Sequence, residues 1–196
     1  MIRQRFSWLV SLMALVVALG ACSSIRDDYV KKPSTALPPA TTSPRDRYIQ
    51  AATNQHPADS GFRLLIGSTN ALMSRVALAD HAKQSIDLQY YIFENDATGR
   101  LIMQRLLAAA DRGVRVRLLI DDLDVKHETN VLEALNSHPN IRVRLFNPFT
   151  TRNPSTLSKA FQLLTDWDKL NRRMHNKSFI VDNNVAIVGG RNIGDA

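Results

Sequence analysis

Short apolar segments alternate with amphipathic ones through the middle of the chain, and this alternation restricts the fold more than any other feature. Segments typical of strands lie at residues 86–93, 114–120 and 141–146. Segments with the apolar spacing of helices lie at residues 98–112, ending before Gly113, and at residues 128–137. Strands and helices in this order are typical of right-handed parallel crossovers. We therefore expect an α/β fold with a mixed, largely parallel sheet flanked by helices.

Two further segments extend this pattern at its ends. Before the first strand, residues 62–66 are apolar, and Ser68 is a plausible N-cap for a helix with Leu72, Val76 and Ala79 on one face. After the third strand, residues 159–170 have a helical pattern. Each would place a helix against the predicted sheet.

The last part of the chain predicts a β-hairpin. His175 and Lys177 alternate with Phe179 and Val181, so these four side chains would share one face of a strand. Residues 182–184 are Asp-Asn-Asn, which favours a turn, and the apolar residues 185–188 return as a second strand. The hairpin would hold an imidazole and an ammonium side by side.

This pair of groups suits chemistry on a phosphate ester. The reaction needs a nucleophile or acid, a fixed positive charge and additional donors, which His175, Lys177 and the Asn192 amide could supply. Gly189 and Gly190 would let the backbone approach a bound group. On residue types alone, a surface hairpin with an incidental His and Lys is an equal alternative.

The spacing of these residues resembles a known signature. His175-x-Lys177-x4-Asp182 is similar to the HxKxxxxD motif of the phospholipase D superfamily. Residues 171–177 with residues 189–195 resemble the cardiolipin synthase branch, as do residues 86–91. The resemblance covers residues 62–196 and implies half of a bilobal phospholipase D-like fold.

The resemblance also implies a mechanism and a site. His175 would be the nucleophile that forms a phosphohistidine, or its acid partner, and Lys177 would bind the substrate phosphate. Asn192 would be an additional phosphate donor, and Asp182 a supporting catalytic position that orients or neutralises. The family needs no metal and no cofactor, and the expected reaction is phosphatidyl transfer to a lipid hydroxyl or phosphodiester hydrolysis.

The chain differs from the family in carrying one HxKxxxxD motif in 196 residues, where enzymes of this branch carry two in about twice that length. We therefore expect an N-terminal half, which would need the missing C-terminal half or a homodimer partner for a complete site. The alternative is a catalytically inactive, membrane-tethered fragment that at most binds anionic phospholipid. The excess of 25 Lys and Arg over 18 Asp and Glu, a net charge of +7, fits an anionic partner, and the resemblance favours phospholipid over nucleic acid.

Residues 1–21 resemble a bacterial lipoprotein signal peptide. Arg3 and Arg5 precede an apolar segment at residues 6–19, which is short for a membrane span. Leu-Gly-Ala-Cys at residues 19–22 resembles a lipobox, so Cys22 would be acylated. A plain signal peptide or an uncleaved anchor is the alternative. We expect a lipid-anchored protein of the cell envelope that faces the periplasm, with the outer membrane favoured.

Composition divides the remainder into a tether and a domain. Residues 22–60 contain five prolines among Ser, Thr and Ala, which predicts an extended tether, and residues 61–196 would form the domain. Cys22 is the sole cysteine, which excludes an intramolecular disulfide, and the histidines outside the motif have no metal-ligand spacing.

Polar residues follow the predicted parallel strands, where ligands bind in open α/β sheets. They are Glu94, Asp121, Asp122 and Asn147. For each of them singly, a helix cap or a solvated loop is the simpler interpretation. Tyr90 and Tyr91 point to opposite faces, so one would be in the core and the other could reach the mouth of the site.

Overall fold

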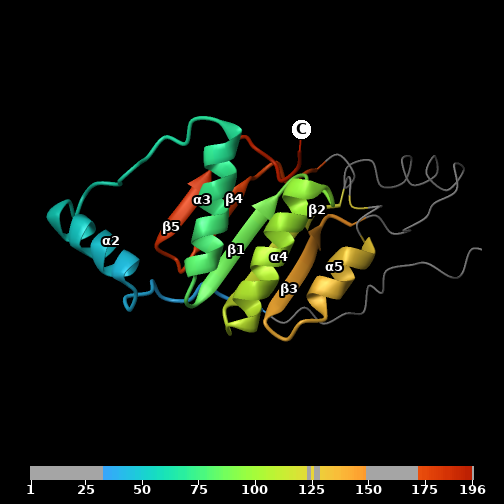
Figure 1. The fold of residues 1–196 in the computed structure, drawn as a ribbon, viewed down its shortest axis with the longest axis horizontal. Helices are drawn as coiled ribbons and strands as arrows, with labels where there is room; N and C mark the ends of the chain where they lie inside the picture. The colour runs from blue at the N-terminus through green and yellow to red at the C-terminus, as the bar shows by residue number, and fades with distance from the viewer. Residues whose placement is uncertain (1–32, 123–124, 126–128, 149–171, 196) are drawn as a thin grey trace, which may run out of the picture. The chain divides into compact units, whose positions relative to one another are not determined.

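A five-stranded sheet in the order β3-β2-β1-β4-β5 organises the chain, as the computed structural model shows (Figure 1). The structure describes residues 33–122, 125, 129–148 and 172–195. The signal peptide, Cys22 and the helix expected at residues 159–170 lie outside this part. The strands are β1 (Ser85–Tyr90), β2 (Arg115–Asp121), β3 (Ile141–Phe146), β4 (Ser178–Val181) and β5 (Val185–Val188). The helices are α2 (Pro44–Gln55), α3 (Ser68–His81), α4 (Ala97–Asp111) and α5 (Thr129–Asn136).

The sheet is parallel on one side of β1 and antiparallel on the other. β1 pairs with β2 and β2 with β3 in parallel, whereas β4 is antiparallel to both β1 and β5. The predicted mixed, largely parallel α/β sheet is therefore confirmed. Because β4 is antiparallel to β1, the beginning of β4 lies beside the end of β1, with Ser178 opposite Gln89.

Helices α3, α4 and α5 lie on the face of the sheet that is turned toward the viewer in Figure 1. Alternate strand residues point into this layer, so that Ile86, Leu88 and Tyr90 of β1 are at most 2% exposed. Each such apolar side chain contributes about 1.5–3 kcal/mol when it is fully buried. Packing of these side chains therefore fixes the inner strands, and with them the positions of the residues at the strand ends.

Helix α4 begins six residues after β1, and its N-cap Asp96 accepts a hydrogen bond from the Gly99 N–H at 2.8 Å. The backbone of residue 94 passes so close that a Cβ on Gly99 would lie 1.7 Å from the Glu94 carbonyl oxygen. Only glycine fits at this position. The turn from β1 into α4 is thus compact and well defined.

Part of the segment expected to be an extended tether is helical and packed. Residues 44–55 form α2, which begins with a capping box in which the Ser43 hydroxyl and the Asp46 carboxylate bond each other's backbone N–H groups. Thr35 precedes this helix, and its carbonyl oxygen accepts a hydrogen bond from the Arg117 guanidinium at 3.2 Å. The described residues 33–47 thus belong to the folded domain, contrary to the expectation of an extended chain.

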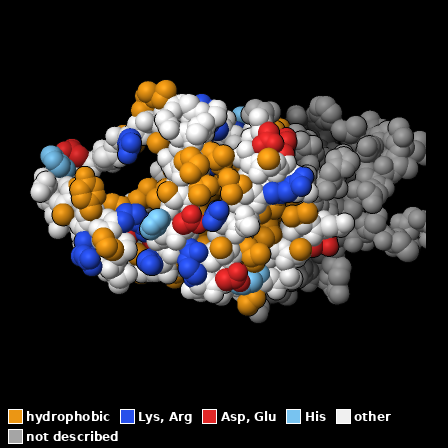
Figure 2. Space-filling model, viewed as in Figure 1, with side chains coloured by type: hydrophobic (Ala, Val, Ile, Leu, Met, Phe, Trp, Pro, Cys, Tyr) orange, Lys and Arg blue, Asp and Glu red, His pale blue; other side chains and the backbone are white. Residues whose placement is uncertain are grey.

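The connection from α2 to α3 is exposed, although residues 62–66 are apolar. Phe62 is 91% exposed, Leu64 82% and Ile66 71%. Figure 2 shows an opening between this connection and the rest of the molecule. Within the segment, Leu65 is half-buried and packs against the core. The predicted N-cap is also displaced by one residue: Gly67 is the N-cap of α3, and the Ser68 hydroxyl accepts a hydrogen bond from Arg191 instead.

The predicted hairpin is present as β4 and β5. Asp182 and Asn183 adopt left-handed backbone with φ of 53° and 52°, and the Asn184 N–H donates to the Val181 carbonyl oxygen. This is the turn that Asp-Asn-Asn chemistry predicts. Phe179 and Val181 are fully buried, so one face of β4 is part of the core.

Candidate active site

The site lies at the edge of the sheet where the parallel strands end. His175 and Lys177 precede β4, and the antiparallel pairing brings this segment beside the last residues of β1. The Asn176 amide bonds the Gln89 side chain at 3.1 Å and strengthens this contact. Because β2 and β3 run parallel to β1, their last residues, Asp121 and Phe146, reach the same edge. This is the position that open α/β sheets use for ligands.

His175 and Lys177 meet on one aromatic ring. The Tyr91 ring centroid lies 4.7 Å from that of His175, and the Lys177 Nζ lies 5.1 Å from the Tyr91 centroid. A cation over an aromatic face is attracted to it. The predicted side-by-side placement of His175 and Lys177 is therefore present, although both residues lie just before the strand rather than within it.

The two groups differ in their exposure to solvent. His175 is exposed, whereas Lys177 is only 7% exposed. The Lys177 Nζ donates to the His175 carbonyl oxygen at 3.1 Å. The ammonium has three N–H donors, and this contact uses one of them. A largely buried ammonium interacts strongly with a nearby anion because little water screens it.

Tyr90 and Tyr91 divide as predicted. Tyr90 is fully buried and its ring packs edge-on against Phe93, with centroids 6.1 Å apart. Burial raises the pKa of Tyr90, and the Arg75 guanidinium, whose Nε donates to the hydroxyl at 3.0 Å, opposes this. Tyr91 is half-buried and faces His175 and Lys177.

The residues that end β2 and β3 hold the segment before His175. Asp121 accepts hydrogen bonds from the Met174 N–H at 2.8 Å and from Arg173 Nη1 at 3.2 Å. The Asn147 amide donates to the Arg172 carbonyl oxygen at 2.7 Å. The sequence singled out Asp121 and Asn147 by their positions, but a helix cap or loop was the simpler interpretation. Local sequence patterns do not predict these hydrogen-bond partners, which lie 25 to 53 residues away in the chain.

Asn192 reaches the same edge and contacts the residue after Tyr91. Its Oδ1 accepts the Ile92 N–H at 3.3 Å, and residues 93 and 193 form a parallel bridge. The Asn192 Nδ2 has no hydrogen-bond partner among the described residues, so it is available as a donor. At Gly189 and Gly190, an added Cβ would meet nothing within 4 Å, so the backbone there is open to a ligand.

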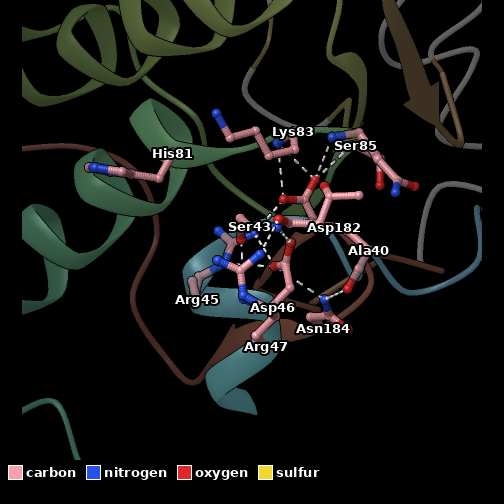
Figure 3. A network of polar contacts seen from close by, with 12 residues as sticks. Ala40, Ser43, Arg45, Asp46, Arg47, His81, Lys83, Ser85, Asp182 and Asn184 are labelled. Atoms are coloured by element: carbon pink, nitrogen blue, oxygen red, sulfur yellow. Dashed lines mark hydrogen bonds and ion pairs between the residues drawn. The ribbon is translucent and has the colours of Figure 1, made fainter. Parts of the chain in front are cut away.

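Asp182 is the one residue of the motif that the structure places elsewhere. It lies in the turn after β4, five residues beyond Lys177, which corresponds to about 17 Å along an extended strand. Its carboxylate accepts backbone N–H groups of Lys83, Gln84 and Ser85 at 2.7–3.1 Å (Figure 3). The expectation that Asp182 orients or neutralises the reacting groups does not agree with this geometry. Asp182 instead ties the hairpin turn to the beginning of β1.

Asp182 belongs to a buried ionic network with residues near α2 (Figure 3). Arg45 forms ion pairs with both Asp182 and Asp46. Burial acts to raise the pKa of Asp46, but hydrogen bonds from the Ser43 hydroxyl and N–H, together with Arg45, outweigh it and lower the pKa to about 2. Asn184 adds contacts to the Ala40 carbonyl oxygen at 2.5 Å and to Asp46 at 3.3 Å. The network fastens residues 40–47 under the hairpin turn.

Two absences concern the part of the chain that the structure describes. Within it, no group of three or more His, Cys, Asp or Glu side chains is placed to hold a metal ion. None of its helices has both the length and the apolar character needed to cross a membrane.

The model of the family described as "Cardiolipin synthase, PLD-like domain" matches residues 76–196. Cardiolipin synthase C of Escherichia coli is 52% identical over 143 residues, which are 73% of this chain and 29% of that protein. A cardiolipin synthase of Staphylococcus aureus is 32% identical over 118 residues, or 59% of this chain and 21% of that protein. The chain thus spans less than a third of the length of these relatives.

Solved structures of similar proteins include Nuc of Salmonella typhimurium, a phospholipase D family member. It is 26% identical and has a TM-score of 0.42, covering 63% of this chain and 65% of that one. NucT from Helicobacter pylori is 21% identical with a TM-score of 0.46, covering 64% of this chain and 69% of that one.

The family model extends over more than half of the chain, from within α3 to the end of the sequence, and it includes both arms of the hairpin. The chain therefore belongs to the cardiolipin synthase family of phospholipase D-like proteins.

Proposed function

We propose that this chain supplies one half of a phosphatidyltransferase or phosphodiesterase site that acts on phospholipid through a phosphohistidine. The observation that carries this proposal is the meeting of His175 and Lys177 on Tyr91 at the ligand-binding edge of the sheet. Family membership supports phospholipase D-like chemistry.

In the first step, an imidazole nitrogen of His175 forms a bond to phosphorus as the bond from phosphorus to the leaving oxygen breaks. The leaving oxygen takes a proton from an acid on the opposite side. In the second step, an acceptor hydroxyl attacks phosphorus and gives its proton to that same group, and the bond from phosphorus to nitrogen breaks. An alcohol acceptor gives a new phosphodiester, and water gives hydrolysis.

The other side chains of the site suit the charge that develops on the phosphoryl oxygens. Lys177 would hold those oxygens, and its burial strengthens the attraction. The Asn192 Nδ2 would add a neutral donor. The exposed backbone of Gly189 and Gly190 would let a phosphate group approach closely.

The acid of the first step is proposed to come from outside the described residues. The sequence contains one HxKxxxxD motif, and the chain spans 29% of cardiolipin synthase C. A second His would therefore be supplied by a complementary half or by a second copy of the chain. In the first step the roles of the two His residues can be exchanged, so His175 is the nucleophile or its acid partner.

The test is turnover of phosphatidylglycerol vesicles by the complete protein, with cardiolipin and phosphatidic acid as the measured products. Loss of a member of a covalent catalytic unit costs on the order of 10³- to 10⁶-fold, and we expect that loss for His175→Ala. His56→Ala is the control, because this side chain is 68% exposed at the end of α2. Lys177→Arg should recover only part of the rate lost in Lys177→Ala, since a planar fork replaces a compact charge.

Three results would decide the proposal. Wild-type rates in His175→Ala would refute it, as would complete loss of activity on adding a metal chelator. Vesicle binding without turnover in the wild type would favour the alternative, a membrane-tethered protein that binds anionic phospholipid without reacting with it.

A further inference from the structure

Asp121 is a buried carboxylate at the end of β2, directly beside the segment that carries His175. It is fully buried, and it accepts the Met174 backbone N–H at 2.8 Å as well as Arg173 Nη1 at 3.2 Å. Burying an ionised carboxylate is costly unless hydrogen bonds and an opposite charge compensate it. These two contacts come from the two residues that immediately precede His175.

Neighbouring contacts hold the same short segment at further points. Arg173 Nη1 also approaches the Asn147 carbonyl oxygen at 3.4 Å, and the Asn147 amide donates to the Arg172 carbonyl oxygen. Residues 172–174 belong to no strand of the sheet. Hydrogen bonds to side chains therefore hold this segment in place of backbone hydrogen bonds between strands. The segment is thereby fastened to the ends of β2 and β3.

The register of the sheet relates this anchor to the other contact of His175. Ile120 pairs with Tyr90 in the parallel ladder. The residues that follow them, Asp121 and Tyr91, are therefore neighbours where the two strands end. Asp121 holds the backbone one residue before His175, and Tyr91 packs against its ring at 4.7 Å. The exposed imidazole is therefore located by one backbone anchor and one ring contact.

We propose that Asp121 is a positioning residue: its carboxylate fixes the backbone at Met174 and so places the His175 ring against Tyr91. This inference rests on the proposed function for its catalytic meaning, but its structural part does not. Displacing a reacting group by about 1 Å can cost about 10²-fold in rate. Asp121 acts through the position of His175 and not by contact with substrate.

The test uses the nearly isosteric substitution Asp121→Asn. Arg173 Nη1 donates to Oδ1 of Asp121 and the Met174 N–H donates to Oδ2. An amide has an acceptor oxygen at one of these positions and a donor NH₂ group at the other, so it cannot accept at both. One of the two contacts is lost, while the volume of the side chain is kept. Asp87→Asn is the matched control, because Asp87 forms a bidentate pair with Arg117 at 2.5 and 2.6 Å in the same sheet, between β1 and β2.

The first measurement is NMR of the complete protein with isotope-labelled histidine, in which His175→Ala identifies the His175 signal. The chemical shift of the His175 signal depends on the ring current of Tyr91. It should therefore change in Asp121→Asn and stay the same in Asp87→Asn. If it is unchanged in Asp121→Asn, the proposal is overturned. Should Asp121→Asn not fold, Arg173→Gln, which removes the ion pair and keeps an amide donor, is judged by the same criterion.

The second measurement is turnover of phosphatidylglycerol. We expect kcat to fall ten- to a hundredfold in Asp121→Asn with KM changed less than threefold, because binding groups such as Lys177 remain. A pure loss of stability would instead lower the amount of folded protein without changing kcat per folded molecule, and that result would overturn the catalytic part. If the wild type has no turnover, the proposed function fails, and the NMR result still decides whether Asp121 positions His175.

Discussion

The side chains of Tyr91 and His175 are in direct contact, with ring centroids 4.7 Å apart and ring planes inclined by 56°. The same Tyr91 ring lies 5.1 Å from the Lys177 ammonium. One aromatic side chain from the end of β1 thus sets the positions of both groups that are proposed to act on phosphate. Its ring, more than its hydroxyl, makes these contacts.

We expect Tyr91→Phe to keep at least half of the wild-type rate and Tyr91→Ala to lose about tenfold. The alanine variant removes a cation–π contact worth about 0.5–2 kcal/mol and frees the His175 ring. The measurement is kcat for phosphatidylglycerol. Tyr48→Ala is the control because Tyr48 is 76% exposed on α2. Equal losses in Tyr91→Phe and Tyr91→Ala would assign the effect to the hydroxyl instead.

Asp182→Ala should reduce stability far more than it affects chemistry. The change removes the acceptor for the N–H groups of residues 83–85 and leaves the partly buried Arg45 without one of its partners. Breaking a buried ion pair by removing one partner costs about 3–5 kcal/mol. We expect a loss of that size in the free energy of unfolding, measured by urea denaturation.

Arg45→Ala should cost less than Asp182→Ala, because the three backbone N–H donors to Asp182 remain. In the double variant the two losses should not add, as expected for residues in direct contact. The rate per folded molecule should stay within about threefold of the wild type in both single variants. A rate loss above 10²-fold in fully folded Asp182→Ala would show a catalytic role that the geometry does not indicate.

Stability should fall in acid through Asp46. The pKa of this carboxyl is lowered from 3.8 to about 2 in the folded state, so the folded protein holds the ionised form more strongly than the unfolded chain does. This contribution is fully present above pH 4 and is lost as the pH falls from about 4 to 2. It amounts to about 2 kcal/mol at neutral pH.

Urea denaturation at pH 6 and pH 3 measures this effect. Asp46→Asn should lower stability at pH 6 and show a smaller further loss at pH 3 than the wild type. Asp59→Asn serves as the control, since the Asp59 side chain is 74% exposed. A wild-type pH dependence that Asp46→Asn leaves unchanged would assign the acid sensitivity to other carboxylates.

Cys22 lies outside the described residues, and its acylation is a proposal that rests on Leu-Gly-Ala-Cys at residues 19–22. Acyl chains would hold the mature protein at a membrane, because each buried methylene contributes about 0.8 kcal/mol. Wild-type protein should therefore sediment with membranes, and Cys22→Ala should be released to the soluble periplasmic fraction. Equal release of both proteins would contradict lipid anchoring.

The sequence predicted the sheet well because its strands have strong apolar alternation. β1, β2, β3 and the hairpin lie within a few residues of their expected positions. The position of Asp182 could also have been derived. The Asp-Asn-Asn turn and the strand before it imply that Asp182 is a strand length away from Lys177, which excludes direct contact.

The packing of residues 33–47 and the helix at residues 44–55 do not follow from composition. Proline and serine content predicted an extended chain, yet Ser43-Pro44 followed by Asp46 has the pattern of a capping box with proline at the first helical position. That pattern indicates a helix. The hydrogen bonds of Arg45 and Asn184 that secure it span 137 and 144 residues, and single-sequence reasoning has no means of pairing such positions.

The same limit applies to Asp121 and Met174, which are 53 residues apart. Their contact depends on the order of strands in the sheet, and the order was not predicted. The alternation of β2 identifies which residue ends the strand, but only the placement of β4 beside β1 brings the His175 segment within its reach.

The pairing of β4 with β1 also determines when the site can form. Ser85 and Asp182 are joined by a hydrogen bond across 97 residues, and the rest of that ladder has similar separations. Contacts between such distant positions form late, because the entropy of closing a long loop must be overcome first. During synthesis, β1, β2 and β3 can assemble while β4 is still inside the ribosome. We therefore expect His175 and Lys177 to reach Tyr91 after β1, β2 and β3 have assembled.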